Sequence, residues 1–128
     1  MRYTQIEKGI QKELCRYVSL RYPKAIFKSD LSGLRLPIKT ATELKKLRSS
    51  NGFPDFELLE PTKDFHGLFI EIKAENNSPY NKTNGLLKKD KHLQEQQAMI
   101  NSLVKRGYCA MFGIGLHECI DIVDNYLK

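Results

Sequence analysis

The stretch GFPDFELLEPTKDFHGLFIEIK, residues 52–73, carries the strongest structural signal in this sequence. Its two apolar runs, residues 56–59 and 67–73, are short enough and close enough to predict two strands that pair as a hairpin. A glycine and a proline directly before Asp55 predict a turn that places this carboxylate at the start of the first strand. Asp55 is therefore expected to face Glu71 of the second strand across the hairpin.

Glu71 and Lys73 are expected to share one face of the second strand, because strand side chains alternate between faces. A carboxylate and an amine in an apolar strand carry a desolvation cost. One explanation is a surface ion pair on a half-exposed strand, which is common and stabilises little. The other involves Asp55, since two close carboxylates repel each other unless a cation binds between them. Mg²⁺ or Mn²⁺ suits such oxygen ligands.

The first predicted helix, residues 5–21, adds a third acidic side chain to this region. At 3.6 residues per turn, Glu7 falls inside the apolar arc, Glu13 at its margin, and Gln11 just outside its other edge. A core-facing glutamate needs a partner. A metal centre could supply one, directly or through water; alternatively, the stem of Glu7 packs while its carboxylate reaches solvent.

A helix predicted at residues 90–106 also carries a polar side chain on its apolar face, in this case an amide. Gln96 falls on its apolar face, and a buried amide must be hydrogen-bonded. The backbone could satisfy it, or it could position an active-site lysine or a water. Gln97 lies at the edge of the same face and is the rival candidate.

The remaining segments alternate between helices, strands and polar loops. Thr40 and Glu43 form a capping box that predicts the start of a short helix. The other expected segments are a strand at 25–28, a loop at 30–37, the short helix at 41–49, a polar loop at 76–84, a strand at 108–114 and a last helix after Gly115. This order predicts one α/β domain, residues 1–128, with a central mixed sheet flanked by helices.

The charge of the chain favours a polyanionic partner. Lys and Arg number 21 against 15 Asp and Glu, for a net charge of +6. Nucleic acid is the first expectation and an anionic membrane the second, although a basic protein can also simply be soluble. Few aromatic residues lie among the cations, so base stacking is not indicated. The residues expected to contact DNA phosphates are Lys45, Lys46, Arg48, Lys88, Lys89 and Lys91.

The three cysteines, Cys15, Cys109 and Cys119, lack C-x-x-C spacing. They are predicted to be reduced, as in an intracellular protein, and no zinc site is expected because no histidine pairs with them at ligand spacing. The first residues predict no signal peptide, and no segment is long enough to span a bilayer. The chain is therefore expected in the cytoplasm of a bacterium or of a phage-infected host, without a membrane partner.

Taken in order, these motifs resemble the PD-(D/E)xK nuclease superfamily, and more narrowly a stand-alone virus-type replication-repair nuclease (VRR-NUC) domain. The resemblance covers nearly the whole chain and implies a restriction-endonuclease-like core. A long polar insertion, residues 75–93, departs from the family pattern. The resemblance rests on Glu7 and Gln11, on TATELKKLRSSNGFPDF at 40–56, on Glu71-Ile72-Lys73, and on Gln96 with Leu103 and Gly107.

The resemblance also implies roles for individual residues. Asp55 and Glu71 would ligate the metal, with the carbonyl of Ile72 as a further oxygen. Lys73 would orient or activate the attacking water. The remaining two roles fall to Glu7, which would complete the site, and to Gln96, which would support Lys73 or the substrate.

The resulting expectation is a Mg²⁺- or Mn²⁺-dependent DNA endonuclease that is selective for branched DNA such as Holliday junctions. Stand-alone members of the family are similar to Holliday junction resolvases, so a homodimer is expected. Within enzymes, the alternative substrates are flap, nicked, single-stranded or duplex DNA, including a restriction-like target. Outside enzymes, the alternatives are a non-catalytic basic DNA-binding module and an α/β interaction protein.

Overall fold

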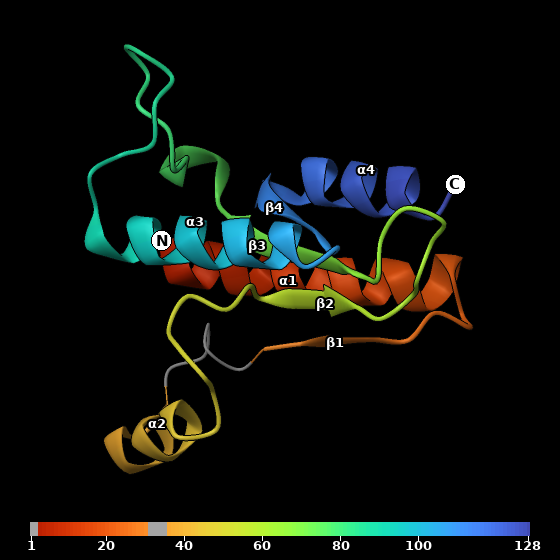
Figure 1. The fold of residues 1–128 in the computed structure, drawn as a ribbon, viewed down its shortest axis with the longest axis horizontal. Coiled ribbons are helices and arrows are strands. Elements are labelled where there is room, and N and C mark those ends of the chain that lie inside the picture. Colours follow the sequence, from red (N-terminus) through yellow and green to blue (C-terminus); the bar gives the residue numbers. More distant parts are fainter. Residues whose placement is uncertain (1–2, 31–35) are drawn as a thin grey trace.

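A four-stranded mixed sheet lies at the centre of the fold (Figure 1). This computed structural model describes residues 3–30 and 36–128. The strands follow the order β1-β2-β3-β4, with β1 to β3 antiparallel and β4 parallel to β3. The predicted α/β class with a mixed sheet is confirmed. The strands are β1 (Phe27–Ser29), β2 (Phe56–Leu58), β3 (Leu68–Lys73) and β4 (Cys109–Ile114).

The predicted hairpin between β2 and β3 is confirmed by its register. Phe56 lies opposite Ile70, and Leu58 lies opposite Leu68. Every residue of β3 is buried. Such burial is typical of a strand with layers packed on both of its faces.

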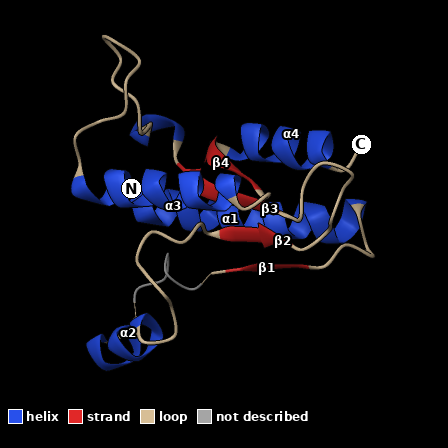
Figure 2. Cartoon of the chain, in the orientation of Figure 1, coloured by secondary structure: helices blue, strands red, loops and turns tan. Residues whose placement is uncertain are grey.

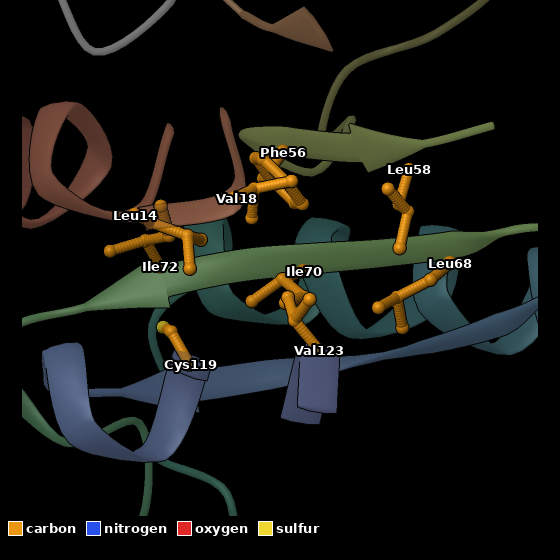
Figure 3. Close-up of a cluster of buried hydrophobic side chains, with 9 residues drawn as sticks. All are labelled: Leu14, Val18, Phe56, Leu58, Leu68, Ile70, Ile72, Cys119 and Val123. Atoms are coloured by element: carbon orange, nitrogen blue, oxygen red, sulfur yellow. The ribbon is translucent and has the colours of Figure 1, made fainter. Parts of the chain in front are cut away.

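Two helices, α1 (Tyr3–Arg21) and α4 (Leu116–Tyr126), cover one face of the sheet (Figure 2). Figure 3 shows the core between them, where Ile70 and Ile72 of β3 meet Leu14 and Val18 of α1 and Val123 of α4. This cluster is fully buried, and its removal from water holds these two helices against the sheet.

The opposite face of the sheet is covered by α3 (Lys91–Lys105). Phe69 of β3 packs there against Leu93 and Leu103. Because Phe69 faces α3 while Ile70 and Ile72 face α1, the alternation of the strand puts Glu71 and Lys73 on the α3 side.

The short helix α2 (Ile38–Lys45) has no buried residue and projects from the body below the sheet in Figure 1. The predicted start at Thr40 is wrong. The first helical bond runs from the Ala41 N–H to the Pro37 carbonyl, so Pro37 takes the cap position and the helix begins at Ile38, three residues earlier than predicted. It also ends before the predicted residue 49, because the following amides bond to carbonyls three residues back.

The predicted polar loop at 76–84 contains more order than expected. A single 3-10 turn, η2 (Glu75–Asn77), is followed by a short hairpin closed by a bridge between Tyr80 and Leu87. Residues 79–88 are called the arm below. The arm projects from the body in Figure 1, above the start of α3.

Two further observations complete the fold. Residues 31–35, which belong to the predicted loop at 30–37, lie outside the described residues. Among the helices that the structure describes, none combines the length and the apolar character needed to cross a membrane.

Candidate active site

The turn that carries Asp55 lies directly against α3. Gly52 adopts a φ of 88°, which side chains other than glycine rarely tolerate. A Cβ at this position would lie 2.7 Å from the carbonyl oxygen of Glu95 in α3. Pro54 is fully buried. This close approach brings Asp55 to the place where α3 covers the end of β3.

The Asp55 carboxylate extends the β2–β3 pairing beyond the last residue of the ladder. Its Oδ2 accepts a hydrogen bond from the Ile72 N–H at 2.9 Å. The regular ladder has already ended at the pair of Phe56 and Ile70. Asp55 is thus anchored at the end of β3, beside Glu71 and Lys73.

The main chain of β3 turns a carbonyl oxygen toward the same space. The Lys73 carbonyl accepts from the Gly115 N–H on the β4 side. Alternate residues of a strand direct their N–H and C=O groups to opposite sides, so Ile72 directs both toward the β2 side. Because β2 has ended there, the Ile72 carbonyl faces the region that Asp55 occupies.

Glu71 is buried, with only 3% of its surface exposed. Burial raises the pKa of its carboxyl well above the ordinary value, and the Asp55 carboxylate raises this pKa further by accepting a hydrogen bond from it and by its charge. The positive charge of Lys73 lowers the pKa of Glu71, and the negative charge of Glu7 raises it. The structure therefore brings the carboxyl groups of Asp55 and Glu71 together.

Lys73 is also buried, with 8% of its surface exposed. The explanation of Glu71 and Lys73 as a surface ion pair is wrong, because neither residue is at the surface. Within the described residues, no carboxylate lies within ion-pair distance of the Lys73 amine. A buried amine without an ion-pair partner is costly, and such groups are concentrated at functional sites.

Glu7 reaches the site from α1, across the end of β3. Its Oε2 accepts from the Ala74 N–H at 3.0 Å and from Asn77 Nδ2 at 3.4 Å. The alternative in which its carboxylate simply extends into solvent is therefore wrong. Glu7 closes the end of β3 and adds negative charge near Glu71.

The oxygen atoms at this site suit a hard divalent cation. Across residues 3–30 and 36–128, no group of three or more His, Cys, Asp or Glu side chains is arranged to hold a metal ion. The available set is smaller: the two carboxyls of Asp55 and Glu71 and the carbonyl of Ile72. Mg²⁺ commonly binds through one or two carboxylates and keeps several waters, so this set fits it. A cation would also relieve the repulsion that raises the Glu71 pKa.

Gln96, rather than Gln97, faces the interior from α3. Gln96 Oε1 is buried and has no hydrogen-bond partner in the described part of the chain. Gln97 donates to Asn101 at the exposed surface. An unsatisfied buried acceptor costs about 1–3 kcal/mol, so Gln96 is a candidate to accept from a group that enters the site.

Gln11 is a positioning residue that the sequence pattern placed incorrectly. It was expected just outside the apolar arc, yet it is 8% exposed. Its Nε2 donates to Ser29 Oγ at 2.6 Å and to the Asp30 carbonyl at 2.8 Å, and lies 3.5 Å from the Asp55 carbonyl. Gln11 thus ties α1 to the strand and turn that hold Asp55. Its spacing of four residues from Glu7 is the signal that could have placed it on the same side of the helix.

Replacing Gln11 with alanine is expected to destabilise the protein by about 1–3 kcal/mol, because the variant loses the hydrogen bonds from its buried amide to Ser29 Oγ and the Asp30 carbonyl. The melting temperature should fall by roughly 4–12 °C for a domain of this size. Gln5→Ala on the exposed part of the same helix is the matched control and should change little. Equal melting temperatures for the two variants would contradict the positioning role.

The six cations expected to bind DNA differ in their surroundings. Arg48 pairs with Asp30 at 2.6 Å in a partly buried ion pair, and Lys46 lies 3.5 Å from Glu43 at the surface. The other four form no ion pair within residues 3–30 and 36–128. Figure 1 shows that α2 and the arm project at the end of the molecule where β3 ends and α1 and α3 begin. The free cations are Lys45, Lys88, Lys89 and Lys91.

Comparison with known proteins places this fold. A solved structure described as a "VRR_NUC domain protein" is similar to the chain with a TM-score of 0.65 and 22% sequence identity. The similarity covers 96% of this chain and 88% of that one. No protein-family model matches the sequence, and no curated protein matches it. The likeness therefore establishes the fold through its three-dimensional arrangement.

Proposed function

The chain has a VRR-NUC-like fold, and on that basis we propose that it is a nuclease that hydrolyses phosphodiester bonds of DNA with the aid of Mg²⁺ or Mn²⁺. One observation carries the proposal. Asp55 and Glu71 converge at the end of β3 beside the buried amine of Lys73, and the pKa of Glu71 is raised there. Buried ionisable groups whose pKa is shifted by burial and by a charged neighbour are concentrated at functional sites.

The two carboxylates and the Ile72 carbonyl would hold the cation. When bound, the cation supplies Lewis-acid polarisation of the phosphodiester. Asp55 is held in place by its bond to the Ile72 N–H, so it requires little reorganisation when the substrate arrives. Glu7 would support the site from the opposite side of β3.

Lys73 and Gln96 would act on the reacting groups. The Lys73 amine, buried on the same face as Glu71, would orient the attacking water and stabilise the negative charge that develops on the phosphate. The free Oε1 of Gln96 would accept from Lys73 or from that water. The Lys73 side chain and Gln96 Oε1 are both buried, and low exposure strengthens their electrostatic effect.

The proposed substrate is branched DNA, bound by the lysines that flank the site. Lys45 on α2 and the lysines near the arm would neutralise phosphates on either side of the cut. A homodimer would place two such sites symmetrically, which suits paired incisions in a branched substrate.

The test is a cleavage assay on five DNA substrates: four-way, flap, nicked, linear duplex and single-stranded DNA. With Mg²⁺ or Mn²⁺, we expect cleavage that is fastest on the four-way substrate, and we expect none in EDTA. DNA binding that persists in EDTA without cleavage under any divalent cation would refute the nuclease and favour a binding module. Equal rates on all substrates would refute only the selectivity.

A further inference from the structure

A cavity of about 430 Å³ lies between the sheet and the chain that follows α2. Residues of β1 and β2 line one side of it, and Leu44 of α2 and the two residues Leu47 and Arg48 line the other. Phe53, from the turn that carries Asp55, also lines it. Pockets that hold small ligands in proteins measure roughly 300–1,000 Å³, so the cavity is large enough for one such ligand.

The strand residues that line this cavity lie on the same side of the sheet as Glu71 and Lys73. Lys28 is paired with Glu57, and Glu57 is paired with Phe69. Directly paired residues of neighbouring strands point to one face of a sheet, and Phe69 points toward α3. A group in the cavity would therefore lie on the face of the sheet that carries the candidate active site.

Hydrogen bonds also join the cavity to the turn that carries Asp55. Ser29, which lines the cavity, donates from its Oγ to the Asp55 carbonyl at 2.9 Å. The Asp30 N–H donates to the same carbonyl at 2.7 Å. Phe53 belongs to this turn as well. One short segment therefore positions both the cavity and the carboxylate that would hold the cation.

The charged side chains that line the cavity balance one another. Arg48 pairs with Asp30 at 2.6 Å, and Lys28 lies 3.5 Å from Glu57. A phosphate in this cavity would face the two carboxylates as well as the two cations, so the net attraction would be small. The balance favours a neutral ligand that forms hydrogen bonds over a free phosphate.

The rest of the lining suits a flat ring with a polar edge. Phe53 is partly exposed, and no other ring in the described part of the chain packs against it. Leu44 and Leu47 add apolar surface. The Arg48–Asp30 pair places N–H donors next to a carboxylate acceptor, which complements the mixed donors and acceptors on the edge of a base. Proteins that hold a base outside the helix use the same combination of aromatic or apolar surface and hydrogen bonds.

From these observations we propose that the cavity takes one unpaired nucleobase next to the cleaved phosphodiester, with its face on Phe53 and its edge at the Arg48–Asp30 pair. This inference rests on the proposed nuclease function and assigns its preference for branched DNA to a specific pocket. A base must leave the stack before it can enter, and this costs least where the base is already unpaired. Base stacking was not expected from the sequence, and Phe53 is the residue that would provide it.

The decisive experiment measures binding of 5′-flap and 3′-flap DNA in EDTA. Each flap is compared with matched DNAs in which the unpaired nucleotides next to the branch are made abasic, one at a time. Wild-type protein is expected to bind about tenfold more weakly when one of these bases is missing, which is the scale of one stack between a base and an aromatic ring. Phe53→Leu lacks the ring, so it should bind the intact flap about tenfold more weakly and lose nothing more with the abasic DNA.

A second pair of variants keeps the test decisive if Phe53→Leu disturbs the turn. Leu47 is 79% exposed and lines the cavity, whereas Ile38 is 87% exposed and does not line it. Leu47→Glu and Ile38→Glu therefore add the same charge at exposed positions of one projecting segment. Leu47→Glu should abolish the difference between intact and abasic flaps, and Ile38→Glu should retain it. The same behaviour in both variants would contradict the pocket.

The outcomes separate this inference from the nuclease proposal. If wild-type protein cuts DNA but binds intact and abasic flaps equally, the base pocket is refuted and the nuclease stands. A loss with abasic DNA that persists in Phe53→Leu would also refute the pocket, because the base would then be bound elsewhere. If wild-type protein cuts no DNA with any divalent cation, the nuclease is refuted, and the comparison of intact with abasic flaps alone decides whether the cavity takes a base.

Discussion

Lys73→Met is expected to cut DNA about 1,000-fold more slowly than the wild-type protein, which is the upper range for loss of a group that stabilises developing charge. Methionine preserves an unbranched apolar stem at a position that is 8% exposed, so the strand and its packing should survive. The amine is the only part that is lost. The expected result is therefore a folded protein that binds DNA and does not cut it.

Measurement of this variant needs both a rate and a fold criterion. Single-turnover cleavage of the preferred DNA gives the rate, and the melting temperature reports the fold. Lys105→Met is the matched control, because Lys105 is exposed at the other end of α3. A Lys73→Met protein that cuts within a few-fold of the Lys105→Met rate would show that the amine has no part in the chemistry.

The hairpin and its turn could be predicted because the local sequence favours the same strands and turn that burial in the core favours. The apolar run at residues 67–73 is continuous, so a strand covered on both faces is its natural state. The turn before Asp55 contains a glycine and a proline whose backbone preferences fit few alternatives. The two strands are neighbours in the sequence and pair antiparallel, with Phe56 opposite Ile70.

The start of α2 could not be predicted from the sequence, since no packing holds this helix. None of its residues is buried, so no apolar stripe marks its limits. Thr40 and Glu43 match a capping box, but the Pro37 carbonyl already accepts the first helical bond. A capping motif that is not followed by an apolar stripe indicates that a helix is nearby. It does not show at which residue the helix begins.

Two features could not be predicted from the sequence. The burial of Gln11 depends on carbonyls that are distant in the sequence, and the closure of the arm depends on main-chain hydrogen bonds. Gln11 is buried because carbonyls near Asp30 and Asp55 accept from it, and a helical projection counts only apolar neighbours. The arm reads as a polar loop because its order comes from backbone bonds between Asn81 and Leu86, which composition does not reveal. Both features belong to the surroundings of the site rather than to its core.

Glu71→Gln is expected to be more stable than the wild-type protein at pH 8 in the absence of a divalent cation. The folded state raises the pKa of Glu71 above its ordinary value of 4.5, so the folded protein holds this proton more tightly than the unfolded chain. The stabilisation from the protonated form is fully present below the unfolded pKa and is lost as the pH rises through the folded pKa. Glutamine mimics the protonated form at every pH and avoids that loss.

The expected gain is about 1–2 kcal/mol, the usual size when a strained functional site is relieved. This corresponds to a melting temperature roughly 3–8 °C higher at pH 8, with a difference that shrinks toward zero near pH 4. Glu13→Gln is the matched control. Glu13 is exposed near Arg16, so its replacement should shift the melting temperature little at either pH.

Addition of Mn²⁺ should reverse the order of the two proteins. A cation held by Asp55 and Glu71 stabilises the folded wild-type protein in proportion to the logarithm of its concentration, whereas the variant lacks one of the two carboxylates. The wild-type melting temperature should therefore rise with Mn²⁺ while that of Glu71→Gln stays constant, and cleavage should be lost in the variant. Equal increases of the melting temperature with Mn²⁺ in both proteins would place the cation elsewhere. A Glu71→Gln protein that is less stable than the wild type at pH 8 would show that the fold itself needs the ionised Glu71 carboxylate.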